Sequence, residues 1–131
     1  MRDINRIIIH HTATPAHMNI GVREIRHWHV EDNGWSDIGY HFVIRRDGVV
    51  EAGRPIKIAG AHAKGYNADS IGIALVGTGP DFTRHQWRAM EEKVILLMAQ
   101  YGNPDVIGHR DVASTQCPGF NVKIWYNKME D

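Results

Sequence analysis

The hydrophobic positions of this chain fall into short continuous runs, separated by segments with helical spacing. Residues 6–10 and 70–77 are apolar over consecutive positions, which is typical of strands covered on both faces of a sheet. Residues 105–108 form a shorter run of the same kind. These three runs are predicted to be buried strands.

A β-hairpin is predicted between residues 37–45 and 49–52. The two runs flank Arg46-Asp47-Gly48, and an Asp-Gly pair between β-rich runs is a strong hairpin signal. On the first of these strands, alternation would place Tyr40, Phe42 and Ile44 on one face.

Helical spacing is clearest over residues 83–101. Thr83 and Gln86 predict a capping box at its start, and Gly102 follows its end. Shorter helices are predicted over 21–32 and after Asn121. The expected core stripe of the long helix is Trp87, Met90, Val94, Leu97, Met98 and Tyr101.

Alternating strands and helices predict an α/β fold: one domain over residues 1–131, with a mixed central β-sheet flanked by helices. Fifteen basic and fifteen acidic residues cancel, which argues against a nucleic-acid partner held by phosphate contacts. No apolar run is long enough to span a bilayer, and the first six residues do not form a secretory leader. Cytoplasmic synthesis without a membrane partner is therefore expected.

Candidate chemistry gathers around the single cysteine. Cys117 lies eight residues after His109, in a loop that follows the run 105–108. A lone cysteine forms no internal disulfide, so packing, redox chemistry, nucleophilic attack and metal binding are the alternatives. His10 and His11 close the first apolar run, and adjacent strand residues face opposite ways, so at most one faces a site. Two histidines and a thiolate would leave the fourth zinc position open, as in catalytic zinc sites.

Several motifs in order give this pattern a family likeness. They are Ile8-Ile9-His10-His11-Thr12-Ala13-Thr14, Gly39-Tyr40-His41-Phe42, His62-Ala63-Lys64-Gly65-Tyr66-Asn67, Ser70-Ile71-Gly72, Gly108-His109-Arg110-Asp111 and Cys117-Pro118-Gly119-Phe120. Together they resemble the zinc-dependent N-acetylmuramoyl-L-alanine amidases, which share a fold with the peptidoglycan recognition proteins. The likeness is greatest to the T-seven-like phage lysozymes, which are amidases despite their name.

The resemblance implies roles for individual residues. His10, His109 and Cys117 match the family's Zn²⁺ ligands, which favours His10 over His11. Tyr40 matches a tyrosine near the metal-bound water. Thr115 matches a second catalytic position, where the phage relatives carry lysine and the catalytic recognition proteins carry threonine. A threonine donates a hydrogen bond but supplies no charge.

Other residues of the expected site are less specific. His62 and Asn67 would border a groove for the muramyl-peptide, although each could instead satisfy local backbone groups. No His-Glu-x-x-His motif supplies a base, so Tyr40 is the first candidate proton acceptor and His62 the second. The remaining histidines are expected to be structural or surface residues: His17, His27, His29, His41 and His85.

Four candidate functions, each from a different class of protein, can be compared. The favoured one is a monomeric phage or prophage endolysin that cleaves the amide bond between N-acetylmuramic acid and L-alanine in peptidoglycan, after release through a phage membrane pore. A binding module without catalysis is disfavoured because Cys117 is present. Binding to a phage RNA polymerase is a third role, disfavoured by the short segment before the first strand. A glycosidase would need a carboxylate pair, which the contexts of Glu24 and Glu51 do not suggest.

Overall fold

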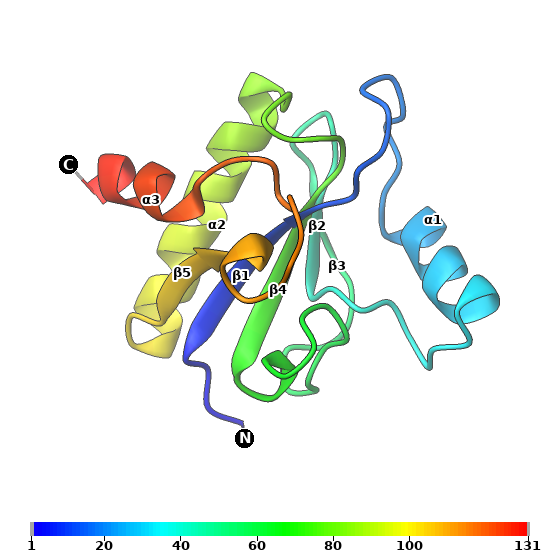
Figure 1. Cartoon of the computed structure of the whole chain (residues 1–131), viewed down its shortest axis with the longest axis horizontal. Coiled ribbons are helices and arrows are strands. Elements are labelled where there is room, and N and C mark those ends of the chain that lie inside the picture. Colours follow the sequence, from blue (N-terminus) through cyan, green and yellow to red (C-terminus); the bar gives the residue numbers. More distant parts are fainter. Residues whose placement is uncertain (1, 131) are drawn as a thin grey trace.

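The computed structural model describes residues 2–130, which form a five-stranded sheet in the order β3-β2-β4-β1-β5 with helices on both faces (Figure 1). This arrangement confirms the predicted mixed α/β fold. The strands are β1 (Arg6–His11), β2 (Phe42–Ile44), β3 (Val50–Ala52), β4 (Ser70–Leu75) and β5 (Asp105–Gly108). The α-helices are α1 (Val22–His27), α2 (Arg84–Tyr101) and α3 (Val122–Glu130).

The first strand lies inside the sheet. β1 pairs in parallel with β4 on one side, where Arg6 is opposite Ser70, and with β5 on the other, where Arg6 is opposite Asp105. Both faces of β1 are covered, which explains why its sequence is continuously apolar. Only β3 runs antiparallel, as the second strand of the predicted hairpin.

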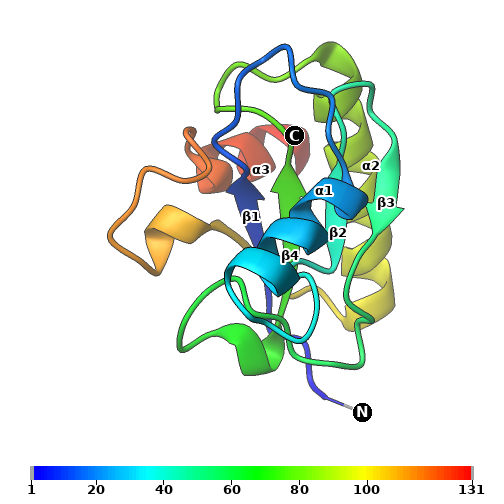
Figure 2. The ribbon, with the colours of Figure 1, turned by 90° about the vertical axis from the view of Figure 1, so that its right-hand side faces the viewer.

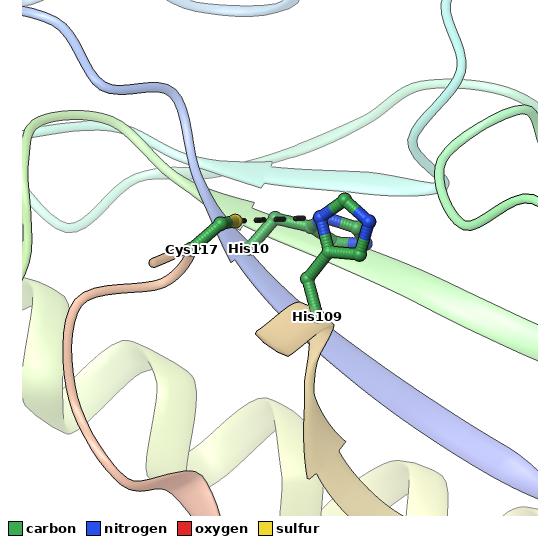
Figure 3. A group of neighbouring side chains, drawn as sticks. All are labelled: His10, His109 and Cys117. Atoms are coloured by element: carbon green, nitrogen blue, oxygen red, sulfur yellow. Dashed lines mark hydrogen bonds between the residues drawn. The ribbon is translucent and has the colours of Figure 1, made fainter. Parts of the chain in front are cut away.

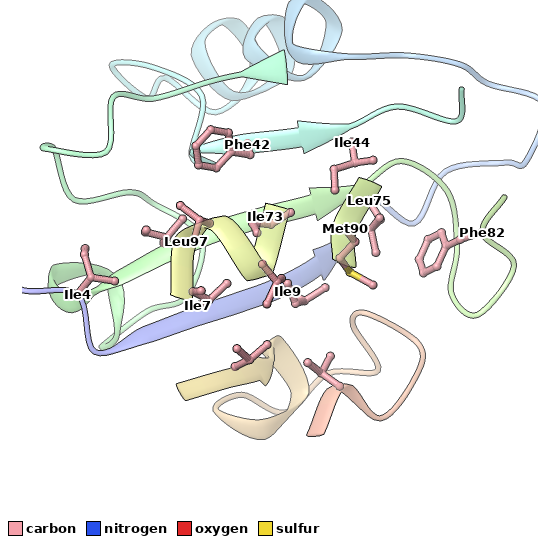
Figure 4. Close-up of a cluster of buried hydrophobic side chains, with 14 residues drawn as sticks. Ile4, Ile7, Ile9, Phe42, Ile44, Ile73, Leu75, Phe82, Met90 and Leu97 are labelled. Carbon is pink, nitrogen blue, oxygen red and sulfur yellow. The ribbon is translucent and has the colours of Figure 1, made fainter. Parts of the chain in front are cut away.

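The larger core lies between the sheet and α2. Ile7 and Ile9 of β1 point toward this face, where they join Met90, Val94 and Leu97 of α2 (Figure 4). The predicted capping box is present, since Gln86 N donates to Thr83 Oγ1 and Thr83 N donates to Gln86 Oε1.

The opposite face is covered by α1 and by loops (Figure 2). Val22 and Ile25 of α1 pack with Val43 of β2, and Ile8 of β1 packs with Ala63. Alternation along β1 places His10 on the same face as Ile8, away from α2. His10 therefore faces the side of the sheet that α1 and the loops cover.

One strand is shorter than its hydrophobic pattern predicts. β2 covers only Phe42–Ile44, and the expected sharing of one face by Tyr40, Phe42 and Ile44 is wrong. Tyr40 packs with the α1 cluster, whereas Phe42 and Ile44 join the α2 core. The segment before β2 is irregular, since the adjacent nitrogens of residues 53 and 54 donate to the carbonyls of His41 and Tyr40, and Gly39 N donates to His29 Nδ1 at 2.9 Å.

The predicted helix 21–32 also changes character along its length. It begins as α1 and continues as a π-helical turn over Trp28–Asp32. Such turns occur frequently at functional sites. None of the helices in the described part of the chain is both long and apolar enough to cross a membrane.

Candidate metal centre and cleft

Two of the three candidate ligands lie at the carboxyl ends of neighbouring strands. His10 lies near the end of β1, and His109 opens the short 3-10 turn His109–Asp111 directly after β5. Because β1 and β5 are parallel neighbours, both histidines emerge at the carboxyl ends of the strands, where open sheets usually form sites. Cys117 comes from the loop between β5 and α3 and closes the group (Figure 3).

The three side chains offer ligand atoms that all lie within 4.8 Å of one another. His10 Nδ1 is 3.8 Å from Cys117 Sγ, and the ring centroids of His10 and His109 are 4.6 Å apart. The neighbouring His11 ring has a different partner, since its Nδ1 accepts a hydrogen bond from Gly79 N at 3.0 Å. The group contains the residues that the sequence motifs predicted as ligands.

Two glycines allow the cysteine loop to approach the sheet. A Cβ atom at Gly79, after β4, would collide with the carbonyl oxygen of Pro118, and one at Gly119 would collide with that of Gly79. Any larger residue at either position would push the loop outward. The short distance from Cys117 to His10 therefore depends on this close backbone contact.

Burial sets the charge of the three groups. Desolvation lowers the pKa of His10 well below its ordinary value, with a further contribution from His62, and it also lowers the pKa of His109. Both imidazoles are therefore neutral near pH 7, which is the form that binds a metal. Desolvation raises the pKa of the Cys117 thiol to about 11, although the hydrogen bond from His11 opposes this. A metal ion would displace the thiol proton on binding.

The group lies in a cavity of about 700 Å³ that also contains Tyr40 and Thr115. The Tyr40 ring centroid is 5.1 Å from that of His10. Burial raises the pKa of Tyr40, so its hydroxyl stays protonated at neutral pH and can donate a hydrogen bond. Thr115 Oγ1 accepts a hydrogen bond from Cys117 N at 3.2 Å, and its own hydrogen can still be donated.

His62 and Asn67 also line the cavity, on the loop between β3 and β4. Asn67 Oδ1 accepts hydrogen bonds from the backbone nitrogens of His62 and Ala63, both at 2.9 Å. The Asn67 side chain therefore stabilises this loop. Of its two expected roles, bonding to local backbone groups is the one that these contacts support. His62 Nδ1 lies 2.8 Å from His10 Nε2, a contact that no sequence pattern indicated.

Carboxylates are missing from the cavity lining among residues 2–130. Glu24 Oε1 accepts a hydrogen bond from Gly21 N at 2.8 Å, and Glu51 Oε1 accepts one from Val22 N at 2.9 Å. Both glutamates thus hold the start of α1 rather than flank a substrate bond. This lining does not provide the carboxylate pair that glycoside hydrolysis normally requires.

Comparison with known proteins identifies the family of this chain. A family model described as N-acetylmuramoyl-L-alanine amidase matches residues 1–120. The chain belongs to this amidase family. The endolysin of Enterobacteria phage T3 is 47% identical over 131 aligned residues, which cover 95% of this chain and 86% of that endolysin.

Solved structures confirm the amidase fold. The N-acetylmuramoyl-L-alanine amidase LysC from Clostridium intestinale is 37% identical, with a TM-score of 0.87 and coverage of 98% of this chain and 85% of LysC. Drosophila PGRP-LB is 29% identical, with a TM-score of 0.84 and coverage of 97% of this chain and 81% of PGRP-LB. The predicted resemblance to both amidases and peptidoglycan recognition proteins is thereby confirmed.

The cavity lining also includes three large side chains that were not predicted from the sequence as site residues: His29, Trp35 and Lys64. His29 Nδ1 accepts a hydrogen bond from Gly39 N, which agrees with its expected structural role. Its ring also lies near those of Trp35 and Tyr40, with centroids 4.5 Å and 5.5 Å away. Trp35 precedes the irregular segment that replaces the predicted strand. The π-helical turn and this irregular segment bring His29 and Trp35 to the cavity. The helical spacing over residues 21–32 predicts a helix but does not indicate its π-helical turn.

Proposed function

We propose that this chain is a zinc-dependent amidase that hydrolyses the amide bond between the lactyl group of N-acetylmuramic acid and the L-alanine of the stem peptide. The observation that carries the proposal is the convergence of His10, His109 and Cys117 at the cavity, with ligand atoms within 4.8 Å of one another. Membership of the amidase family supports the assignment of the amide bond that is cleaved. Residues 1–131 would act as one catalytic domain.

The donor set suits zinc. Two imidazole nitrogens and one thiolate are borderline and soft ligands, whereas magnesium and calcium prefer oxygen. Three protein ligands leave a position for water or substrate, as in catalytic zinc sites. When bound, Zn²⁺ would supply a Lewis acid that polarises the scissile carbonyl and activates water.

Tyr40 and Thr115 would donate hydrogen bonds to the reacting group. Both line the cavity that holds the candidate ligands, and the buried Tyr40 hydroxyl is neutral at pH 7. Donors aimed at the developing negative charge of the carbonyl oxygen stabilise the transition state more than the ground state. A neutral, high-pKa phenol is better suited to this role than to removing a proton.

The charge of the cavity fits a peptide that carries carboxylates. Lys64 lines the cavity as a cation, and no carboxylate lies in the lining formed by residues 2–130. The Lys64 side chain is exposed, so it can change its conformation to contact a bound ligand. We therefore propose that the stem peptide lies along the 59–69 loop, with a carboxylate near Lys64.

Digestion of purified peptidoglycan tests the proposal directly. New L-alanine amino termini and new reducing sugar ends would be measured with and without chelator and added zinc. We expect amino termini that disappear with chelator and return with zinc, without reducing ends. Reducing ends would identify a glycosidase, and wall binding without either product would identify a binding module.

Cys117→Ser should abolish hydrolysis and zinc binding while the fold is retained. Serine keeps the size of the side chain but replaces the soft thiolate, which is the anionic ligand of the set. Zinc content, circular dichroism and product formation would be measured on the same sample. Normal turnover by this variant would remove zinc ligation by Cys117 from the mechanism.

The endolysin relatives support a role in phage lysis, in which the enzyme reaches the wall through a membrane pore made by another protein. The monomeric state and binding to a phage RNA polymerase stay predictions from the sequence. Size-exclusion chromatography with light scattering would test the first. A pull-down with a single-subunit phage polymerase would test the second.

A further inference from the structure

The ring of His10 contacts one partner through each of its nitrogens. Nδ1 faces Cys117 Sγ at 3.8 Å, on the side of the candidate metal ligands. Nε2 faces His62 Nδ1 at 2.8 Å. The His10 side chain is only 1% exposed, so this hydrogen bond is not shared with bulk water.

Metal binding at His10 Nδ1 fixes the protons along this line of groups. A neutral imidazole that binds a metal through Nδ1 carries its hydrogen on Nε2. His10 Nε2 would then donate to His62 Nδ1, which leaves the His62 hydrogen on Nε2. That nitrogen lies 3.3 Å from the hydroxyl oxygen of Ser70, a fully buried residue that can accept it.

The fold holds the His62 ring closely in this position. A Cβ atom at Gly72 of β4 would lie 2.6 Å from the His62 ring, and one at Gly60 would lie 2.7 Å from His62 Cδ2. Asn67 fixes the backbone of His62 from the loop side. Two glycines and one amide thus keep the imidazole where its Nδ1 meets His10.

We propose that His62 is a positioning residue for the metal site: its Nδ1 accepts the Nε2 hydrogen of His10 and thereby orients His10 Nδ1 toward the ion. This role rests on the proposed zinc function. It differs from the substrate contact that the sequence motifs suggested for His62, because it acts on the metal ligand and not on the muramyl-peptide. Partners of this kind orient a metal-binding histidine and make it a better ligand.

Zinc affinity, measured by competition with a chromophoric chelator, tests the proposal without any activity assay. His62→Leu removes the acceptor, and we expect roughly a 10- to 100-fold weaker affinity for zinc. His62→Asn keeps an acceptor oxygen near the position of Nδ1, so its affinity should stay within a few fold of the parent protein. Gly72→Ala keeps the imidazole but displaces its ring, and should weaken binding in the same direction as His62→Leu.

Kinetics separate positioning from substrate contact. At saturating zinc, His62→Leu should recover much of its turnover with an unchanged KM for peptidoglycan fragments. A raised KM with normal zinc affinity would overturn the proposal and support the substrate contact. Equal zinc affinity of His62→Leu and the parent protein would also overturn it. If the parent protein itself failed to bind one zinc ion, the proposed zinc function would be wrong. This result differs from the two outcomes above, which concern only the His62 variant.

Discussion

At the scale of single residues, the Tyr40 hydroxyl is the group on which the proposed chemistry depends most directly. Tyr40→Phe keeps the ring that packs 5.1 Å from His10 and removes only the donor. Loss of one transition-state donor typically costs a factor of about 100 to 1,000 in turnover. We expect a fall of that size in the release of L-alanine amino termini, with unchanged zinc content. Full activity would exclude the hydroxyl from the reaction.

His41 gives the fold a dependence on pH through a ring that is not a candidate metal ligand, although it lies 5.8 Å from the His62 ring. Its Nδ1 accepts a hydrogen bond from Gly72 N at 3.0 Å, so its Nε2 carries the hydrogen and donates to the Ile58 carbonyl at 2.9 Å. Burial lowers the pKa of His41 to about 4. Since the unfolded chain binds this proton near pH 6.5, stability is greatest above that pH and falls as the pH drops from about 6.5 to 4.

The variant His41→Asn should lose part of this acid sensitivity. Asparagine can accept from Gly72 N but does not titrate. The parent protein should lose on the order of 2–3 kcal/mol through His41 between pH 7 and pH 4, and the variant should lose that much less. Urea unfolding across this pH range, with chelator present in all samples, measures the difference. Parallel curves for the two proteins would contradict the assigned pKa shift.

At the scale of elements, the start of α2 is tied to the sheet by Gln86. Its Nε2 donates to the carbonyl of Ile44 at 3.2 Å, at the end of β2, and to that of Val76 at 2.8 Å, directly after β4. Its Oε1 accepts from Thr83 N at 3.0 Å. Gln86 is fully buried, so these groups have little access to water if it is removed.

Gln86→Leu should therefore destabilise the protein by about 2–4 kcal/mol, since it leaves buried polar groups without this partner. Thr83→Ala removes the helix cap at a more accessible position and should cost only about 1 kcal/mol. Chemical denaturation of both variants measures the order. A smaller loss for Gln86→Leu than for Thr83→Ala would contradict the anchoring role.

The elements that could be predicted are those whose signals are local. The continuous apolar run of β1 and the capping box of α2 both lie within a few residues, and both predictions are confirmed. Tyr40 was placed on the wrong face because the segment before β2 is bonded to distant groups, including His29. The contact between His10 and His62 spans 52 positions and has no periodic trace. Motif order could indicate the candidate ligands, but not the residues packed around them.

At the scale of the whole molecule, a metal ion at the site would join distant parts of the chain. His10 and Cys117 are 107 positions apart, so a ligand that binds both stabilises the folded state against the unfolded chain. At free zinc about 100-fold above its Kd, the gain is about 2.7 kcal/mol. We expect chelation to lower the melting temperature by roughly 10 °C. Cys117→Ser should show little change on chelation, and equal shifts in both proteins would refute this coupling.

The internal position of β1 has a consequence for synthesis on the ribosome. β1 is made first, but its partners β4 and β5 begin only at Ser70 and Asp105. At elongation rates of about 5–20 residues per second, several seconds pass between the synthesis of β1 and that of β4, its first partner. During that time its edges and its row of isoleucines are exposed to other chains. A host chaperone that shields nascent apolar segments would therefore matter most before β4 emerges.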